Sequence, residues 1–287
     1  MIVRILNDGW SASVKRPGLA GLLYAGNLLL GIILSIPILV AFSSAVSESG
    51  YSPDLGVEFD VALWADILRD SGPLVSTMLM QLLWVIPVFY LWKIGSTVGV
   101  VHAMRDDRTG SFWEGVGRYA GKALLLGLPF LVLAILAVAG LALITALLSA
   151  APIGEVGQFW IRFVVAPILI ILSVAVIDMM HDFARLELVL RSKSVWNSMY
   201  AGMDWFWQSG SAQALYMLWL VIGSLTLILP FWADMALGGL FLAFLLQQTL
   251  LYVRSLVTVG WLTSEVMLFQ ELDPGEPREK PSAEFAA

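Results

Sequence analysis

Long apolar stretches alternate with polar segments along the chain, and this alternation predicts its structural class. An α-helix of about 20 residues crosses the ~30 Å hydrocarbon core of a bilayer. Four stretches without a charged residue exceed that length, and a fifth, before Arg254, nearly reaches it. With one shorter stretch before Asp178, the pattern predicts six transmembrane helices, at about 19–42, 73–93, 123–150, 158–178, 211–233 and 235–254.

The fourth of these spans is the weakest. Its charge-free part runs only from Phe163 to Ile177, which is too short to cross a bilayer alone. Long basic side chains near a membrane boundary extend their charged ends toward water. We therefore expect Arg162 to do so, which lets the crossing begin near Gln158.

The composition supports a helical membrane protein. Hydrophobic residues are 59% of the 287 residues and charged residues 13%, whereas soluble domains have roughly 45–50% and about 25%. Only helices and closed barrels satisfy every backbone group in lipid, and these apolar runs lack the alternation of strands. We expect an all-α polytopic transmembrane bundle, a single domain over 1–271, with a disordered cytoplasmic tail, 272–287.

Basic residues gather on one side of the predicted spans. Fourteen of the sixteen Lys and Arg residues lie there, and only Arg69 and Arg162 fall on the other side. Because cytoplasmic loops carry an excess of basic residues, both termini are predicted to be cytoplasmic. A cleaved signal peptide is the competing interpretation of the N-terminus, but the first apolar run far exceeds the roughly 7–15 residues of a signal-peptide core.

Three tryptophan-containing segments indicate an internal repeat. Trp10, Trp113 and Trp196 each lie in a mixed polar segment before the first, third and fifth spans. Tryptophan favours the membrane interface. The simplest architecture is therefore three helical hairpins, each preceded by a short amphipathic cytoplasmic helix. A further amphipathic helix is expected on the outer surface, within the loop 43–72.

The even-numbered spans place one charged residue each at the same depth. These residues are Lys93, Asp178 and Arg254. Each follows a stretch of about 20 residues, or about 30 Å of helix. The helical pattern continues past them, through Met104, Leu190 and Phe269. We expect the helices to project into the cytoplasm and Asp178 to pair with Lys93 and Arg254, unless all three charges are solvated separately by headgroups.

A polar stripe on the fourth helix is the main candidate site. Its members, at offsets of zero, three, four and seven on one helical face, are Asp178, His181, Asp182 and Arg185. Together with His102 they have the chemistry to bind a divalent cation or relay protons. The chain has two histidines and no H-E-x-x-H motif, so a structural polar network is the simpler interpretation.

The candidate cluster at the cytoplasmic boundary thus comprises Lys93, His102, Asp178, His181, Asp182, Arg185 and Arg254. Asn27, Gln247 and Gln248 are expected in the bundle interior, where polar side chains line helix contacts or a water-filled path. Gly95 and Gly99 are spaced to permit close helix approach. The Asp106 to Arg108 run is interpreted as a solvated turn.

One short motif carries a family resemblance. Asp182-Phe183-Ala184-Arg185 leaves a span and Trp196 to Trp207 leads to the next, and this layout resembles uncharacterised bacterial six-span membrane proteins. It is also similar to the membrane domain attached to some bacterial glycerophosphodiester phosphodiesterases, whose catalytic domain is not matched here. The resemblance implies a protein of the bacterial cytoplasmic (inner) membrane, with a lipid-handling or accessory role. It transfers no catalytic residue.

These observations favour a transport-like or accessory membrane component that handles a small solute, ion or lipid. One alternative is a membrane-embedded enzyme, which requires His102 and His181 to approach a shared carboxylate. A scaffold subunit of a larger complex is the other alternative. We expect membrane lipids as partners, together with membrane proteins or a second copy of the chain, and no nucleic acid. No cofactor, metal or catalytic residue is expected, and the absence of cysteine excludes thiolate sites.

Overall fold

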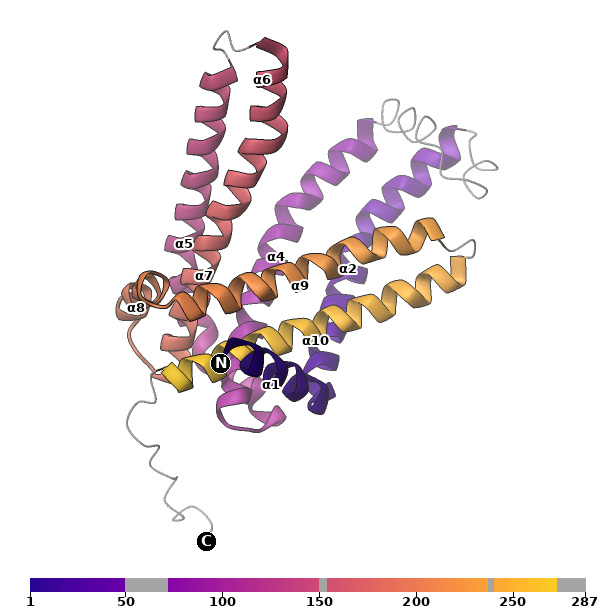
Figure 1. Cartoon of the computed structure of the whole chain (residues 1–287). Helices are drawn as coiled ribbons and strands as arrows, with labels where there is room; N and C mark the ends of the chain where they lie inside the picture. The colour runs from indigo at the N-terminus through magenta and orange to yellow at the C-terminus, as the bar shows by residue number, and fades with distance from the viewer. Residues whose placement is uncertain (50–71, 150–153, 237–239, 273–287) are drawn as a thin grey trace. The chain divides into compact units, whose positions relative to one another are not determined.

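The computed structural model describes residues 1–49, 72–149, 154–236 and 240–272, and every element in these ranges is helical (Figure 1). The all-α class is therefore confirmed for the part of the chain that is described. The predicted outer-surface helix within 43–72 and the tail fall largely or wholly outside these residues.

Long helices dominate the architecture. The elements are α1 (Ile2–Lys15), α2 (Pro17–Ser49), α4 (Gly72–Arg105), the 3-10 turn η1 (Thr109–Ser111), α5 (Phe112–Ser149), α6 (Gly154–Trp160), the π-helical turn η2 (Ile161–Val165), α7 (Ala166–Leu190), α8 (Val195–Gln208), α9 (Gly210–Ala236) and α10 (Leu240–Leu272). Elements α6, η2 and α7 follow one another without a break.

Five helical segments are long and apolar enough to cross a membrane. They are Pro17–Ser44, Leu74–Arg105, Thr109–Ser149, Gly154–Leu190 and Gly210–Leu229. The chain is thus consistent with a multi-pass membrane protein. Helix α10 contains most of the sixth predicted span but is not among the five, so a sixth crossing stays a prediction.

The helices that carry the second, fourth and sixth spans continue beyond their boundary charges, as the sequence predicts. Helix α4 ends at Arg105, α7 at Leu190 and α10 at Leu272. Buried apolar residues gather in these extensions, among them Val98, Phe183, Leu188, Val259 and Leu268. A core of the soluble type is therefore built beyond the apolar spans.

The spans themselves leave large apolar side chains exposed. On α5, Ile135, Leu136, Leu143 and Leu147 are each more than half exposed, up to 65% for Leu147. Such a continuous apolar surface is costly in water but suits contact with lipid. The contrast between an exposed apolar half and a buried polar half is the main reason to treat these helices as membrane-spanning.

The chain divides into two compact units, which we describe separately. The smaller unit covers Leu22–Lys93 and pairs α2 with the first part of α4. Gln81 Nε2 donates to the Leu34 carbonyl oxygen at 2.5 Å, and Trp92 Nε1 donates to Asn27 Oδ1 at 2.8 Å. A single domain over 1–271 stays a prediction.

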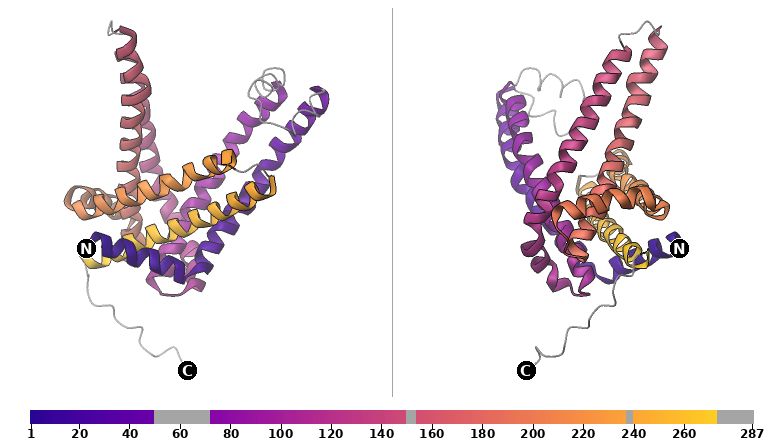
Figure 2. Two further views of the ribbon diagram at one scale, coloured as in Figure 1. Left: turned by 45° about the vertical axis from the view of Figure 1, so that its right-hand side comes forward. Right: turned by 90° about the vertical axis from the view of Figure 1, so that its left-hand side faces the viewer.

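The larger unit contains the remaining helices. Helix α5 packs along α7, α8 packs on α7, α9 runs beside α10, and α1 lies along the C-terminal part of α10 (Figure 2). Ser264 Oγ on α10 donates to the Ile5 carbonyl oxygen of α1 at 3.3 Å. Helix α1 is thereby attached to the end of α10.

Two of the three expected amphipathic helices are separate elements, namely α1 and α8. The third expectation is wrong, because Trp113 lies in the first turn of α5, which continues without interruption to Ser149. No proline interrupts the chain between Trp113 and Lys122, so the polar segment continues directly into the apolar one. Three helical hairpins across a membrane stay a prediction.

Candidate functional site

The polar stripe of α7 is buried by its neighbours. Asp178 is half-buried, and His181, Asp182 and Arg185 are buried. One ligand atom from each of Asp178, His181 and Asp182 lies within 4.8 Å of the other two. The predicted shared face is therefore present, and it points into the protein.

Arg185 lies at the centre of this face. Its guanidinium forms an ion pair with Asp182 one turn earlier, and its Nη1 donates to Thr97 Oγ1 of α4 at 2.7 Å. The Arg185 side chain is only 4% exposed. A buried guanidinium of this kind is stable only with charged and hydrogen-bonding partners, and the cluster supplies both.

Helices α9 and α10 close the other side of the stripe. Tyr216 Oη donates to Asp178 Oδ2 at 3.0 Å, and Trp261 Nε1 donates to Glu265 Oε1 at 2.6 Å. Glu265 is 1% exposed, and its second oxygen, Oε2, has no hydrogen-bond partner in the described part of the chain. We call Thr97, Asp178, His181, Asp182, Arg185, Tyr216 and Glu265 the α7 polar cluster.

Burial changes the acidity of Glu265, which lies 11 residues beyond Arg254 and outside the predicted span. Burial raises the pKa of Glu265 to about 7, the Trp261 hydrogen bond and the Arg185 charge act against that rise, and Asp178 adds to it. A carboxyl with such a pKa exchanges its proton near neutral pH. Glu265 is thus the titratable centre of the cluster.

The α7 polar cluster contains more acidic than basic groups. Asp178, Asp182 and Glu265 supply three carboxyl groups, whereas Arg185 is its one guanidinium. The His181 ring packs against Phe130, with ring centroids 5.2 Å apart. A bound proton or cation lowers the electrostatic repulsion among these buried carboxyl groups.

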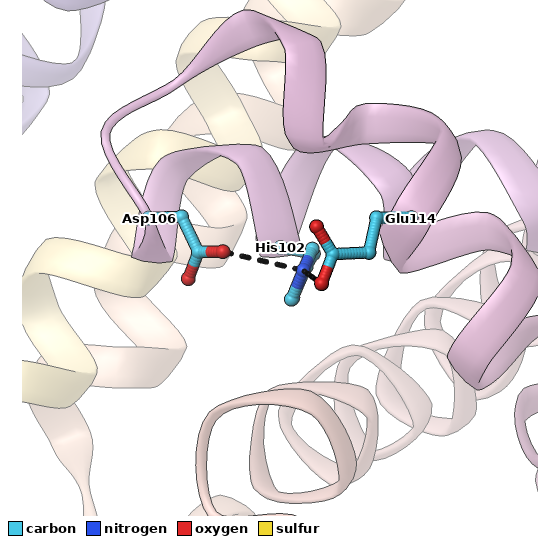
Figure 3. Close-up of side chains that lie close together, drawn as sticks. All are labelled: His102, Asp106 and Glu114. Atoms are coloured by element: carbon cyan, nitrogen blue, oxygen red, sulfur yellow. Dashed lines mark ion pairs between the residues drawn. The ribbon is translucent and has the colours of Figure 1, made fainter. Parts of the chain in front are cut away.

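A second group lies where α4 passes into α5. His102 is fully buried, and its Nε2 is 3.3 Å from Asp106 Oδ2 and 3.9 Å from Glu114 Oε1 (Figure 3). We call these three residues the His102 cluster. Burial works to raise the pKa of Asp106, but the hydrogen bond and charge of Arg105 outweigh it and hold that pKa below its ordinary value.

The two histidines lie in separate clusters among the described residues. His102 is grouped with Asp106 and Glu114, and His181 with Asp178 and Asp182. The shared carboxylate that the enzyme alternative requires is not formed in this part of the chain. The predicted solvated turn is confirmed at Asp107 and Arg108, which are exposed, but it is wrong for Asp106, which is half-buried and pairs with both Arg105 and His102.

The remaining predicted residues lie outside these two clusters. Lys93 ends the smaller unit and is exposed, and Arg254 is exposed on α10. Gln247 and Gln248 are half-buried on α10, and Asn27 is bound to Trp92. Tyr216 is one partner of Asp178, and ion pairs of Asp178 with Lys93 and Arg254 stay predictions.

Sequence reasoning overlooked Glu187, which is 2% exposed. Its carboxylate accepts from Trp205 Nε1 at 3.1 Å, and Lys193 Nζ lies 2.9 Å from Oε2. It joins the end of α7 to α8 and to the connection between them. Its one sequence signal is an acidic residue within the apolar run Leu186 to Leu190.

Arg162 has a partner within the larger unit. On the π-helical turn η2, its Nε donates to Ser149 Oγ of α5 at 2.9 Å. The helix around it begins at Gly154, ahead of Gln158. Arg162 also lines an apolar groove of about 580 Å³ between α5 and α7.

No family model matches this chain, and neither a curated protein nor a solved structure matches it.

Proposed function

We propose that the protein is a transport-like or accessory component of the bacterial cytoplasmic membrane that binds and releases a proton or small cation. It crosses the membrane six times with both termini in the cytoplasm, and the α7 polar cluster lies at the cytoplasmic ends of its helices. The observation that carries the proposal is the buried carboxyl of Glu265, whose pKa burial raises to about 7, in a cluster of three carboxyl groups and one guanidinium.

The charge excess supports ion binding over a purely structural network. A network that only joins helices is most stable when its buried charges balance. Here Arg185 contacts Asp182, Tyr216 donates to Asp178, and the fully buried Glu265 accepts from the neutral donor Trp261. A proton on Glu265, or a cation among the carboxylates, balances the negative charge of the cluster. When that proton or cation is released, the excess of negative charge is restored.

The position of the cluster also supports this proposal. Its groups come from α4, α7, α9 and α10, so a change of charge there acts on several helices at once. Groups that titrate near neutral pH and lie between helices are the usual basis of proton coupling in membrane proteins. The resemblance to membrane domains with a lipid-handling role is compatible with coupling to a second, larger solute.

Proteoliposomes test the proposal. The purified chain is reconstituted with an internal pH dye, and an inside-negative potential is imposed in a buffer of sodium or potassium. We expect proton or cation entry above that of protein-free liposomes, and its loss in Glu265→Gln and in Asp178→Asn. Glu155→Gln, which removes an exposed carboxylate from the first turn of α6, serves as the control and should match the wild type.

Dye acidification identifies the proton, and a radioactive sodium or potassium tracer identifies a metal cation. If the folded wild type passes neither, and if its proton uptake near neutral pH equals that of Glu265→Gln, the proposal is wrong. The scaffold alternative is then favoured, and it predicts bound subunits in native mass spectrometry of the detergent-purified protein.

A further inference from the structure

The His102 cluster joins two helices that approach each other across a short turn. His102 and Asp106 lie one helical turn apart at the end of α4, and Glu114 lies in the first turn of α5. Figure 3 shows the imidazole between the two carboxyl groups. The three donors thus converge from both sides of the turn.

The backbone of the turn holds this arrangement. Asp107 adopts a positive φ of 56°, and the Arg108 amide bonds back to the Ala103 carbonyl oxygen at 3.2 Å. This is the usual way to end a helix with one left-handed residue, and it leaves Asp106 as the last residue before that change. Gly115 allows α5 to approach, because a Cβ atom there would lie 2.4 Å from His102 Cβ.

The buried imidazole lacks the hydrogen bonds that such a group needs. His102 is 0% exposed, and neither Nδ1 nor Nε2 has a hydrogen-bond partner among the described residues. Buried polar nitrogens are nearly always satisfied, and an exception indicates a missing ligand, ion or water. Nε2 faces the two carboxylates at ion-pair distance but without hydrogen-bond geometry to either, and a cation between the three groups would satisfy all of them.

The distances suit one metal ion. Zinc ligands lie about 2.0–2.2 Å from the metal, so two of them at roughly tetrahedral angles are separated by about 3.3–3.6 Å. The separations from Nε2 are 3.3 Å to Asp106 and 3.9 Å to Glu114. The three ligand atoms all lie within 4.8 Å of one another, and the Glu114 side chain, which is 58% exposed, is able to move closer and complete the set.

The surroundings leave one oxygen of each carboxylate available. Arg105 Nε donates to Asp106 Oδ1 at 2.9 Å, which leaves Asp106 Oδ2 directed to the imidazole. The exposure of Glu114 gives a path from water and room for water ligands. An imidazole with two carboxylates is typical of zinc and neighbouring transition metals, whereas magnesium and calcium prefer oxygen ligands alone.

We propose that His102 Nε2, Asp106 and Glu114 form a binding site for a divalent transition-metal ion of the zinc type, which fastens the end of α4 to the start of α5. The site is independent of the α7 polar cluster and of the ion proposed there. With three protein ligands, water completes the coordination, and the ion replaces the missing hydrogen bond of Nε2. Binding holds the turn and stabilises the helix pair.

Metal titration of the full-length protein tests this site. The chain is purified through a histidine-free affinity tag, stripped with a chelator, and titrated with Zn²⁺ by calorimetry and with Co²⁺ by absorption spectroscopy. We expect one ion per chain, with Glu114→Gln and Asp106→Asn each weakening binding by at least about tenfold, since even outer partners of metal ligands are worth 10- to 100-fold. Zn²⁺ should raise the melting temperature of the wild type but not of Glu114→Gln.

Two variants serve as controls. Asp107→Asn removes the same charge from the same turn, but Asp107 is 80% exposed and pairs with Arg16, so it should change affinity by less than about twofold. Asp178→Asn should leave Zn²⁺ binding unchanged and separates this site from the α7 polar cluster. Binding that is absent, unaffected by the Glu114 and Asp106 variants, or equally weakened by Asp107→Asn would overturn the proposal.

Discussion

At Glu265, burial makes a carboxyl group titrate near neutral pH, which an exposed glutamate does not do. It lies among Leu262, Val266 and Phe269 on α10, all buried, and its nearest donor is Trp261 one turn earlier. Removing a carboxylate from water disfavours its charged form more than the tryptophan hydrogen bond favours it. The group therefore holds its proton to a higher pH than an exposed glutamate does.

The raised pKa of Glu265 predicts a pH-dependent stability. Its ordinary pKa is 4.5, and burial raises it to about 7 in the folded protein. The folded state then binds the proton more tightly than the unfolded chain, so the stability that Glu265 contributes is full below its ordinary pKa and is lost as the pH rises through about 7. We expect the melting temperature of the wild type to fall between about pH 5 and about pH 8.

In Glu265→Gln this part of the pH dependence should disappear, because the amide stays neutral throughout. Tryptophan fluorescence measures the transition, since the chain contains 12 Trp residues. Glu155→Gln, at an exposed position, should keep the wild-type profile. Equal slopes for the wild type and Glu265→Gln would contradict the assignment of a raised pKa.

Among helices, small residues decide where close packing occurs. Gly99, predicted to allow close approach, does so against α5, because a Cβ atom at this position would lie 2.7 Å from the Phe112 ring. Gly202 of α8 is tighter still against α7, with the Met180 carbonyl oxygen 2.3 Å from the same hypothetical atom. A backbone atom on the partner helix cannot rotate away as a side chain can.

Gly202→Ala should therefore separate α8 from α7 and destabilise the protein. Overpacking of this kind costs about 1–3 kcal/mol, against which the better helix propensity of alanine returns up to about 1 kcal/mol. Denaturation by sodium dodecyl sulfate, followed by circular dichroism, measures the difference.

Gly117→Ala on α5 is the matched control, since nothing lies within 4 Å of a Cβ atom there. Its stability should equal or exceed that of the wild type. A Gly202→Ala protein as stable as Gly117→Ala would show that α8 does not pack on α7 as described.

Across the whole chain, the number of crossings determines where the ends lie. An even number puts both termini on one side, and an odd number puts them on opposite sides. Five segments satisfy the length and hydropathy needed to span, so the parity depends on α10. Its polar Gln247, Gln248 and Thr249 lower its hydropathy, yet its positive end at Arg254 matches the charge bias of the other spans.

Cysteine labelling tests the number of crossings without background labelling of other positions, because the chain has no cysteine. A membrane-impermeant maleimide should label Asp54→Cys, in the predicted external loop, in intact spheroplasts. Asp8→Cys and Lys280→Cys should react only after lysis. Labelling of Lys280→Cys in intact spheroplasts would place the C-terminus outside and reduce the crossings to five.

The local pattern of the sequence was sufficient for part of the site. The offsets of Asp178, His181, Asp182 and Arg185 predict one face on any helix, because the helical repeat is set by the backbone. The extension of α4, α7 and α10 beyond their boundary charges followed from the same repeat. Asp106 was interpreted incorrectly and Glu187 was overlooked, because their roles depend on burial and on residues distant in sequence.

The apolar runs and their lengths by themselves determined the helical class and the membrane-spanning character, since lipid requires each segment to satisfy its own backbone. Only the tertiary structure decided that Tyr216 and Glu265 face Asp178 and Arg185, and that His102 meets Glu114 rather than His181. The physical reason is that hydropathy and the helical period are properties of a single helix. The pKa of a carboxyl group and the assembly of a ligand set depend instead on the side chains that neighbouring helices place within a few ångströms.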